Sequence, residues 1–159
     1  MLMKSTRRAK ERRPRSSGGA IALQRASAAR GVPPAAKLRS WVRAAYGGAL
    51  EVTVRVVGAA EGRRLNREFR SRDYATNVLS FGYGRRPLRG DIVLCHPVIA
   101  REARKQGKTL SAHYAHLVVH GMLHLRGLDH ARKADAARME RAEIRILGRL
   151  GLGDPYTVE

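Results

Sequence analysis

The chain has 159 residues, of which 43% are hydrophobic and 28% are charged, and its formal net charge is +19. This length and apolar content suit one domain with a single core, and an aromatic content of 5% means that the core must be mainly aliphatic. No apolar run approaches the ~20 residues of a membrane-spanning helix, and no apolar stretch follows the basic N-terminus as in a secretory signal. The single cysteine, Cys95, excludes an internal disulfide. We therefore expect a cytoplasmic protein with no membrane association and no disulfide-linked partner.

The positive charge is concentrated near the N-terminus. Residues 1–43 carry twelve Lys and Arg against one acidic residue, whereas the other 116 residues carry twenty basic and twelve acidic side chains. Cations beside a phosphate backbone release condensed counterions, so this charge favours a nucleic acid as partner. The alternative is a solvated arginine-rich tail. An anionic membrane surface is less favoured, because residues 1–19 lack an apolar face.

In chain order, the composition predicts that residues 1–33 form a basic, disordered arm and that residues 34–156 form the folded domain. Hydrophobic periodicity and chain breakers predict a helix over 35–46, a strand over 51–57, a helix over 59–69, strands over 78–81 and 91–94 with a loop between them, and helices over 97–106, 111–125 and 133–147. Ser111 is a possible N-cap, and Gly127 is placed to end the helix that precedes it. This order predicts an α+β domain with helices packed on a small mixed sheet.

Five of the six histidines fall between His113 and His130. His120 and His124 are four residues apart, which places them on one helix face with about 5–6 Å between Cβ atoms. His116 and His124 are eight residues apart, about 12 Å along a straight helix, so these two cannot reach one ion. His130 can join the pair if the chain turns back at Gly127, since glycine adopts the left-handed conformation that ends helices.

The predicted metal centre is therefore one Zn²⁺ per chain, held by His120, His124 and His130. Three protein ligands leave a fourth position open, as in catalytic zinc sites. Any one of these histidines, taken alone, is more simply an ordinary core or surface residue, and it is the spacing of all three that favours a metal. Asp129 either supports a ligand imidazole or is only a turn residue, and the sequence leaves both interpretations open.

The same spacing occurs in the zinc motif of metzincin proteases, in which a glutamate after the first histidine is the general base. Gly121 occupies that position, so a metalloprotease becomes the second candidate. Cleavage of a phosphodiester needs stabilisation of negative charge, for which arginine is suited. The basic turn over residues 64–81 offers Arg67, Arg70 and Arg72, and spacing alone does not choose among them.

Several segments together resemble a known family. The similar residues are Leu65-Asn66, Phe69-Arg70, Asp73, the run Thr76 to Phe81, Gly90-Asp91-Ile92 and the block from His120 to His130. Together they resemble the YbeY family of bacterial single-strand-specific endoribonucleases, which act in ribosomal RNA maturation and ribosome quality control. The resemblance runs from about Trp41 to Tyr156 and implies zinc at the three histidines, with Arg70 as the functionally required basic residue. Arg72, Asn77 and Asp129 are further candidates for contacts with substrate or with the metal ligands.

The resemblance also implies an α+β fold with a mostly parallel sheet of about four strands and a cleft that holds the metal. The implied partners are single-stranded RNA, ribosomal RNA precursors and the small ribosomal subunit. Ala75 stands where the family usually has proline, and residues 1–33 have no counterpart that we can assign. We expect a zinc-dependent endoribonuclease that processes the 3′ end of small-subunit ribosomal RNA. A non-catalytic ribosome-assembly factor with a structural zinc remains an alternative beside the protease.

Overall fold

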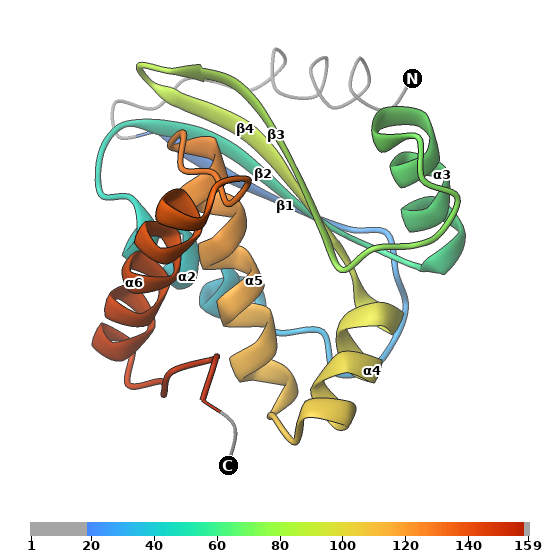
Figure 1. Ribbon diagram of the computed structural model, residues 1–159. Helices are drawn as coiled ribbons and strands as arrows, with labels where there is room; N and C mark the ends of the chain where they lie inside the picture. The colour runs from blue at the N-terminus through green and yellow to red at the C-terminus, as the bar shows by residue number, and fades with distance from the viewer. Residues whose placement is uncertain (1–18, 158–159) are drawn as a thin grey trace.

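The computed structural model describes residues 19–157, and its elements follow one another as strands and helices in a single α+β unit (Figure 1). They are β1 (Ala20–Arg25), α2 (Ala35–Ala45), β2 (Leu50–Val57), α3 (Ala59–Arg70), β3 (Val78–Arg85), β4 (Leu88–Cys95), α4 (His96–Gln106), α5 (Leu110–Leu125) and α6 (Lys133–Arg149). The predicted fold class is confirmed. In the part of the chain that the structure describes, no helix combines the length and apolar character needed to cross a membrane.

The sheet has four strands in the order β1-β2-β4-β3. β1 is parallel to β2 and β2 is parallel to β4, whereas β3 and β4 form an antiparallel hairpin. The predicted mixed, mostly parallel sheet is therefore observed. The predicted loop over residues 82–89 is wrong in extent, since both strands continue into it and the turn is confined to residues 86 and 87. Cross-strand pairing extends strands through sequence that is rich in glycine and arginine.

Helices cover both faces of the sheet, as alternate residues of β4 show. Ile92 and Leu94 belong to the larger core cluster, which includes residues of α2, α5 and α6. Val93 and Cys95 belong to a smaller cluster on the other face, together with Leu65 of α3. Figure 1 shows α2, α5 and α6 gathered on one side of the sheet and α3 on the other. α5 is the central helix of the larger layer, and most of its residues from His113 to Leu125 are buried.

The prediction that residues 1–33 form a disordered arm is wrong for residues 20–25, which form the edge strand β1. Each residue of β1 pairs in parallel with β2, from Ala20 opposite Glu51 to Arg25 opposite Val56. The strand is short and contains two alanines, so its local signal is weak, and the pairing that forms it involves residues about thirty positions away. Residues 1–18 lie outside the described residues.

The N-cap of α5 also differs from the expected one. Thr109, not Ser111, precedes the helix, and its side-chain oxygen accepts a hydrogen bond from the backbone N–H of Ala112 at 3.1 Å. The helix therefore begins one residue earlier than predicted, at Leu110, and ends at Leu125 as predicted.

Candidate metal centre

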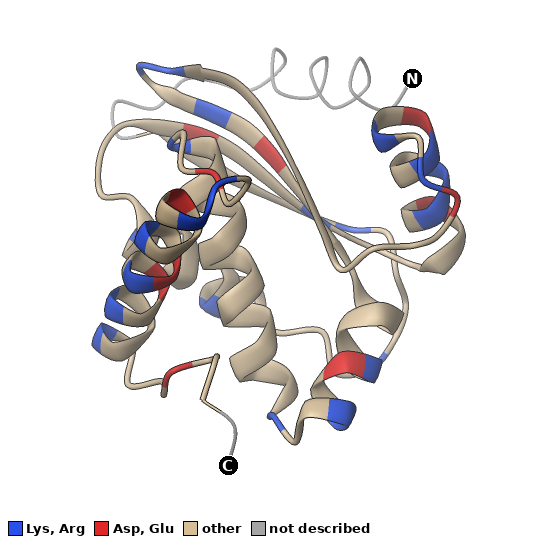
Figure 2. Ribbon diagram, in the orientation of Figure 1, with Lys and Arg blue, Asp and Glu red and all other residues tan. Residues whose placement is uncertain are grey.

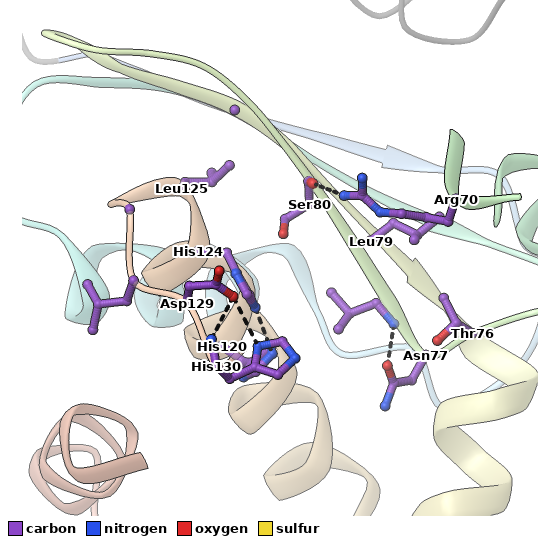
Figure 3. Close-up of a pocket in the computed structure, with 14 residues that line it drawn as sticks. Arg70, Thr76, Asn77, Leu79, Ser80, His120, His124, Leu125, Asp129 and His130 are labelled. Carbon is purple, nitrogen blue, oxygen red and sulfur yellow. Dashed lines mark hydrogen bonds and ion pairs between the residues drawn. The ribbon is translucent and has the colours of Figure 1, made fainter. Parts of the chain in front are cut away.

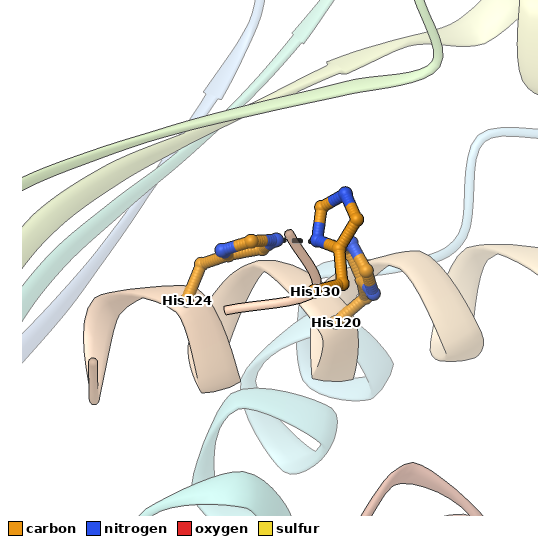
Figure 4. Close-up of side chains that lie close together, drawn as sticks. All are labelled: His120, His124 and His130. Carbon is orange, nitrogen blue, oxygen red and sulfur yellow. Dashed lines mark hydrogen bonds between the residues drawn. The ribbon is translucent and has the colours of Figure 1, made fainter. Parts of the chain in front are cut away.

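Three imidazoles meet beside the C-terminal half of α5. His120 and His124 lie one turn apart on the helix, with their Nε2 atoms 3.2 Å from each other. His130 comes back from the loop after the helix, and one ligand atom from each of the three residues lies within 4.8 Å of the others. The three rings converge on one point in Figure 4. The predicted three-histidine cluster is confirmed.

The chain reversal that brings in His130 is a Schellman turn. The N–H of Gly127 donates to the carbonyl of His124 at 2.9 Å, and the N–H of Leu128 donates to the carbonyl of Leu123 at 3.0 Å. Gly127 has φ +95°, and a Cβ at this residue would lie 2.2 Å from a guanidinium nitrogen of Arg85. The backbone conformation therefore favours glycine, and the end of the Arg85 side chain packs against the space that a Cβ would fill.

Asp129 stabilises the same reversal. Its carboxylate accepts a hydrogen bond from the backbone N–H of His130 at 2.6 Å, and this bond is the main reason that the pKa of Asp129 lies below its ordinary value. The carboxylate is 4.0 Å from the His130 ring nitrogen Nδ1, and both side chains are more than half exposed. The observed contact is that of a turn residue beside the cluster.

A buried carboxylate that the sequence analysis missed lies behind the cluster. Glu143 on α6 is fully buried, and its Oε1 lies 2.5 Å from Nδ1 of His120. Because a carboxylate accepts only, Nδ1 carries the proton and Nε2 of His120 presents its lone pair to the cluster. The other oxygen of Glu143 accepts from the hydroxyl of Tyr156 and lies 3.5 Å from Nε2 of His116. The sequence signal was an acidic residue on the apolar face of a helix, between Met139 and Ile146.

The electrostatics of this group favour an ionised Glu143 and a neutral His124. Burial acts to raise the pKa of Glu143, but hydrogen bonds from His116, His120 and Tyr156 outweigh it and hold the pKa at about 2. Burial, together with the neighbouring His120 and His130, lowers the pKa of His124 to about 4. His124 is therefore neutral at pH 7, which is the form that binds metals.

The geometry fits a metal ion. Two nitrogens bound to tetrahedral zinc at 2.0–2.1 Å are ~3.3 Å apart, close to the 3.2 Å between the Nε2 atoms of His120 and His124. Three imidazole nitrogens, one of them backed by a carboxylate, are a donor set typical of zinc with an open fourth position. The cluster could therefore hold a metal ion without rearrangement of α5.

The cluster forms one wall of a cleft of about 670 Å³. Its lining residues are Arg70, Thr76, Asn77, Val78, Leu79, Ser80, Gly82, His120, His124, Leu125, Gly127, Leu128, Asp129 and His130. Figure 3 shows Arg70 and the first residues of β3 facing the three imidazoles across the cleft. The guanidinium of Arg70 donates to the carbonyl of Ser80 at 3.1 Å and lies 5.4 Å from the centre of the Phe81 ring. Backbone and ring together fix its position.

The structure separates the three arginines that spacing left equivalent. Arg70 lines the cleft. Arg67 lies outside the lining, 3.8 Å from the carboxylate of Asp73. Arg72 also lies outside it, with its guanidinium 3.5 Å from the hydroxyl of Tyr74.

Asn77 lines the cleft, and hydrogen bonds to Glu102 and Val78 hold its side chain. Its amide nitrogen donates to Glu102 of α4 at 3.0 Å, and its amide oxygen accepts from the backbone N–H of Val78 at 2.6 Å. Glu102 also pairs with His113 of α5 at 2.9 Å. This network ties the rim of the cleft to two helices.

The position that carries the general base in metzincins faces away from the cleft. Gly121 is buried, and a Cβ there would lie 3.2 Å from the side chain of Ile92 in β4. The side of α5 that carries Gly121 therefore packs closely against the sheet and does not face the cleft. This packing removes the feature on which the protease alternative depends.

The fold and the site define a small α+β protein whose cleft has a three-histidine cluster that could hold a metal ion on one wall and an arginine opposite the histidines. The family model described as "Endoribonuclease YbeY" matches residues 33–151, and the chain belongs to this family. The endoribonuclease YbeY of Aromatoleum aromaticum is 54% identical over 145 residues, which cover 89% of this chain and 94% of that protein. The endoribonuclease YbeY of Bordetella pertussis is 55% identical over 136 residues, which cover 77% and 87%.

The fold also resembles a solved structure. A protein of Thermotoga maritima, determined in solution, superposes with a TM-score of 0.58 and covers 87% of this chain and 99% of its own. The two sequences are 24% identical, so this likeness concerns the fold.

Proposed function

We propose that this protein is a zinc-dependent, single-strand-specific endoribonuclease of the cytoplasm that matures the 3′ end of small-subunit ribosomal RNA and acts in ribosome quality control. Membership of the endoribonuclease YbeY family supports the reaction class. The single observation that carries the proposal is the cleft with three converging imidazoles on one wall and Arg70 on the other. Its partners are then ribosomal RNA precursors and the small ribosomal subunit.

In this proposal His120, His124 and His130 hold the zinc. Bound zinc supplies Lewis acidity, which lowers the pKa of water and polarises a phosphate oxygen. Glu143 accepts the Nδ1 proton of His120 and so keeps the Nε2 lone pair directed at the ion. Tyr156 and His116 keep Glu143 in place by binding its second oxygen.

Arg70 binds the scissile phosphate. Its contact with Ser80 uses one of the five N–H groups of the guanidinium, so other donors are oriented for a bidentate contact with phosphate oxygens. Negative charge increases on the phosphate as the transition state forms, and a fixed cation on the opposite wall from the histidines stabilises it there.

The dimensions of the cleft favour a single strand. A volume of about 670 Å³ is typical of sites that enclose small ligands, and it matches a few nucleotides rather than a duplex. Thr76, Asn77 and Ser80 provide polar contacts, and Leu125 and Leu128 provide apolar surface for a base. Bases that are not paired can enter such a site and stack there.

The test is cleavage of one RNA sequence presented as a single strand and as a duplex, before and after chelation and after zinc is added back. We expect cleavage of the single strand, its loss on chelation and its recovery with zinc. Protein with the substitution His124→Ala, purified in parallel, controls for contaminating ribonuclease. Chelator-resistant cleavage, or equal cleavage by the His124→Ala protein, would contradict the proposal. A 2′,3′-cyclic phosphate end would identify the ribose hydroxyl as the attacking group, and a 3′-hydroxyl or a linear phosphate would identify water.

A further inference from the structure

A row of exposed arginines runs along the outer face of α6. Arg138, Arg141, Arg145 and Arg149 are exposed and occupy positions i, i+3, i+7 and i+11 of the helix. At 3.6 residues per turn these positions fall within an arc of about 80° and span about 16 Å of the helix axis. Figure 2 shows the blue bands of α6 following one another along its outer side. We call these four residues the α6 arginine row.

The row has no acidic partner within the described part of the chain. None of its four guanidinium groups takes part in a hydrogen bond or ion pair with another described residue. Some arginines on other elements are paired, as Arg63 is with Asp73 at 2.8 Å. Arg141, Arg145 and Arg149 instead follow one another at intervals of four, a spacing at which like charges destabilise a helix. Arg149 in the last turn is favoured by the helix dipole, but the repulsion along the rest of the row is not offset by any acidic partner in the described chain, so the row suits an external polyanion.

The row follows the histidine cluster closely in the chain. α6 starts three residues after His130, and exposed Arg132 and Lys133 lie between the cluster and the row. The opposite face of the same helix carries Glu143, which contacts His120. An RNA strand that leaves the cleft past His130 therefore meets Arg132 and Lys133 first and reaches the row further along the same helix.

We infer that the α6 arginine row binds the backbone of substrate RNA on one side of the cleavage site. The inference rests on the proposed function, because it extends the path of the same RNA beyond the cleft. Arginine forms bidentate contacts with phosphate and carries no sequence code, so the row adds affinity and direction without sequence preference. An anionic membrane fits less well, since the large hydrophobic residues exposed in the described chain are Tyr74 and Tyr156, neither of which lies on α6.

The experiment compares two variants that lose the same charge. In the first, Arg138, Arg141, Arg145 and Arg149 are each replaced by Gln. In the control, the exposed residues Arg39 of α2 and Arg101, Arg104 and Lys105 of α4 are each replaced by Gln. Each protein is tested with a short single-stranded RNA that fills only the cleft and with the same RNA extended on both sides. Affinity is measured by fluorescence anisotropy against KCl concentration on chelated protein, and kcat and KM are measured with zinc.

We expect the row variant to bind the extended RNA at least tenfold more weakly than the control, with a log–log salt slope smaller by about 3, as the loss of four single-strand contacts predicts. Its KM for the extended RNA should rise while kcat, and both constants for the short RNA, stay unchanged. Its melting temperature should stay close to that of wild type, because the four side chains are exposed and the relief of repulsion within α6 offsets the loss of Arg149 from its last turn. This separates lost binding from lost folding.

Equal losses in both variants would overturn the inference, since they would reflect net charge alone. An unchanged salt slope would overturn it as well. The inference would also be overturned if the row variant lost binding to polyglutamate or to phosphatidylserine vesicles but kept wild-type binding to RNA. If no protein cleaves the short RNA, the proposed function fails, and the anisotropy data still decide whether the row binds RNA.

Discussion

At the scale of single residues, the arrangement of the cluster depends on the carboxylate behind it. Replacing Glu143 by Gln keeps an acceptor for the Nδ1 proton of His120 but removes the charge and offers Tyr156 and His116 a poorer partner. We expect zinc affinity to fall 10–100-fold, as for other groups that orient metal-binding histidines. Tyr156→Phe should give a smaller loss. Competition with a chromophoric chelator measures both affinities.

The matched control for these variants is Tyr74→Phe, because Tyr74 is also exposed and its hydroxyl contacts Arg72, away from the cluster. It should bind zinc as wild type does. A Glu143→Gln protein that is folded by circular dichroism and retains full zinc affinity would show that the carboxylate does not position His120.

Substitution of Arg70 should separate an effect on catalysis from an effect on metal binding. Arg70→Ala removes the cation that faces the histidines, and because the side chain contacts Ser80 and Phe81 rather than the imidazoles, zinc affinity should not change. We expect kcat to fall at least 100-fold, the scale found for loss of a transition-state donor. Arg70→Lys should recover little, since an ammonium cannot form the bidentate contact. Arg72→Ala, outside the cleft lining, is the comparison, and equal losses in the two alanine variants would count against a specific role for Arg70.

At the scale of elements, the end of α5 sets the position of His130. An alanine at residue 127 would have to adopt φ +95° and would displace the end of the Arg85 side chain, so Gly127→Ala should cost about 1–3 kcal/mol, mainly through backbone strain, and displace the loop. Gly148→Ala is the control, because nothing lies within 4 Å of its added Cβ and it sits in α6. There alanine should stabilise by about 0.5–1 kcal/mol. Urea unfolding and zinc titration of both variants test this, and a Gly127→Ala protein with wild-type zinc affinity would refute it.

The edge strand β1 can be tested in the same way. Ala22 is buried in the sheet and Ala28 is exposed in the segment that follows. Ala22→Asp should lower the free energy of unfolding by about 2–4 kcal/mol because it buries an unpaired charge. Ala28→Asp should change it by less than about 0.5 kcal/mol. Equal, negligible effects in denaturant unfolding would mean that residues 20–25 do not pair with β2.

At the scale of the whole molecule, a metal that binds only the folded chain stabilises it. The three ligands come from α5 and from the loop beyond it, so unfolding disperses them. At a free zinc concentration 100 times Kd, the free energy of unfolding should rise by about 2.7 kcal/mol, which raises Tm by about 5–10 °C for a chain of this size. Calorimetry with zinc and with chelator measures the shift. The His124→Ala protein should show none of it, and an equal shift there would place the bound metal elsewhere.

The sequence predicted most elements because their signals are local. The alternation of Val52, Val54 and Val56 and the spacing of His120 and His124 are visible within one strand or two helical turns. Proximity at spacing four follows from helix geometry alone, and the stop at Gly127 follows from the conformations open to glycine. The YbeY-like motifs added the expectation that Arg70 matters.

What the sequence by itself determined was the three-histidine set, the α+β class and the absence of a general base at Gly121. The tertiary structure alone decided that Glu143 supports His120, that Arg70 and not Arg72 lines the cleft, and that residues 20–25 complete the sheet. These contacts join residues far apart in the chain. They depend on which faces of the helices and strands pack against each other, and the local periodicity of the sequence does not determine that packing.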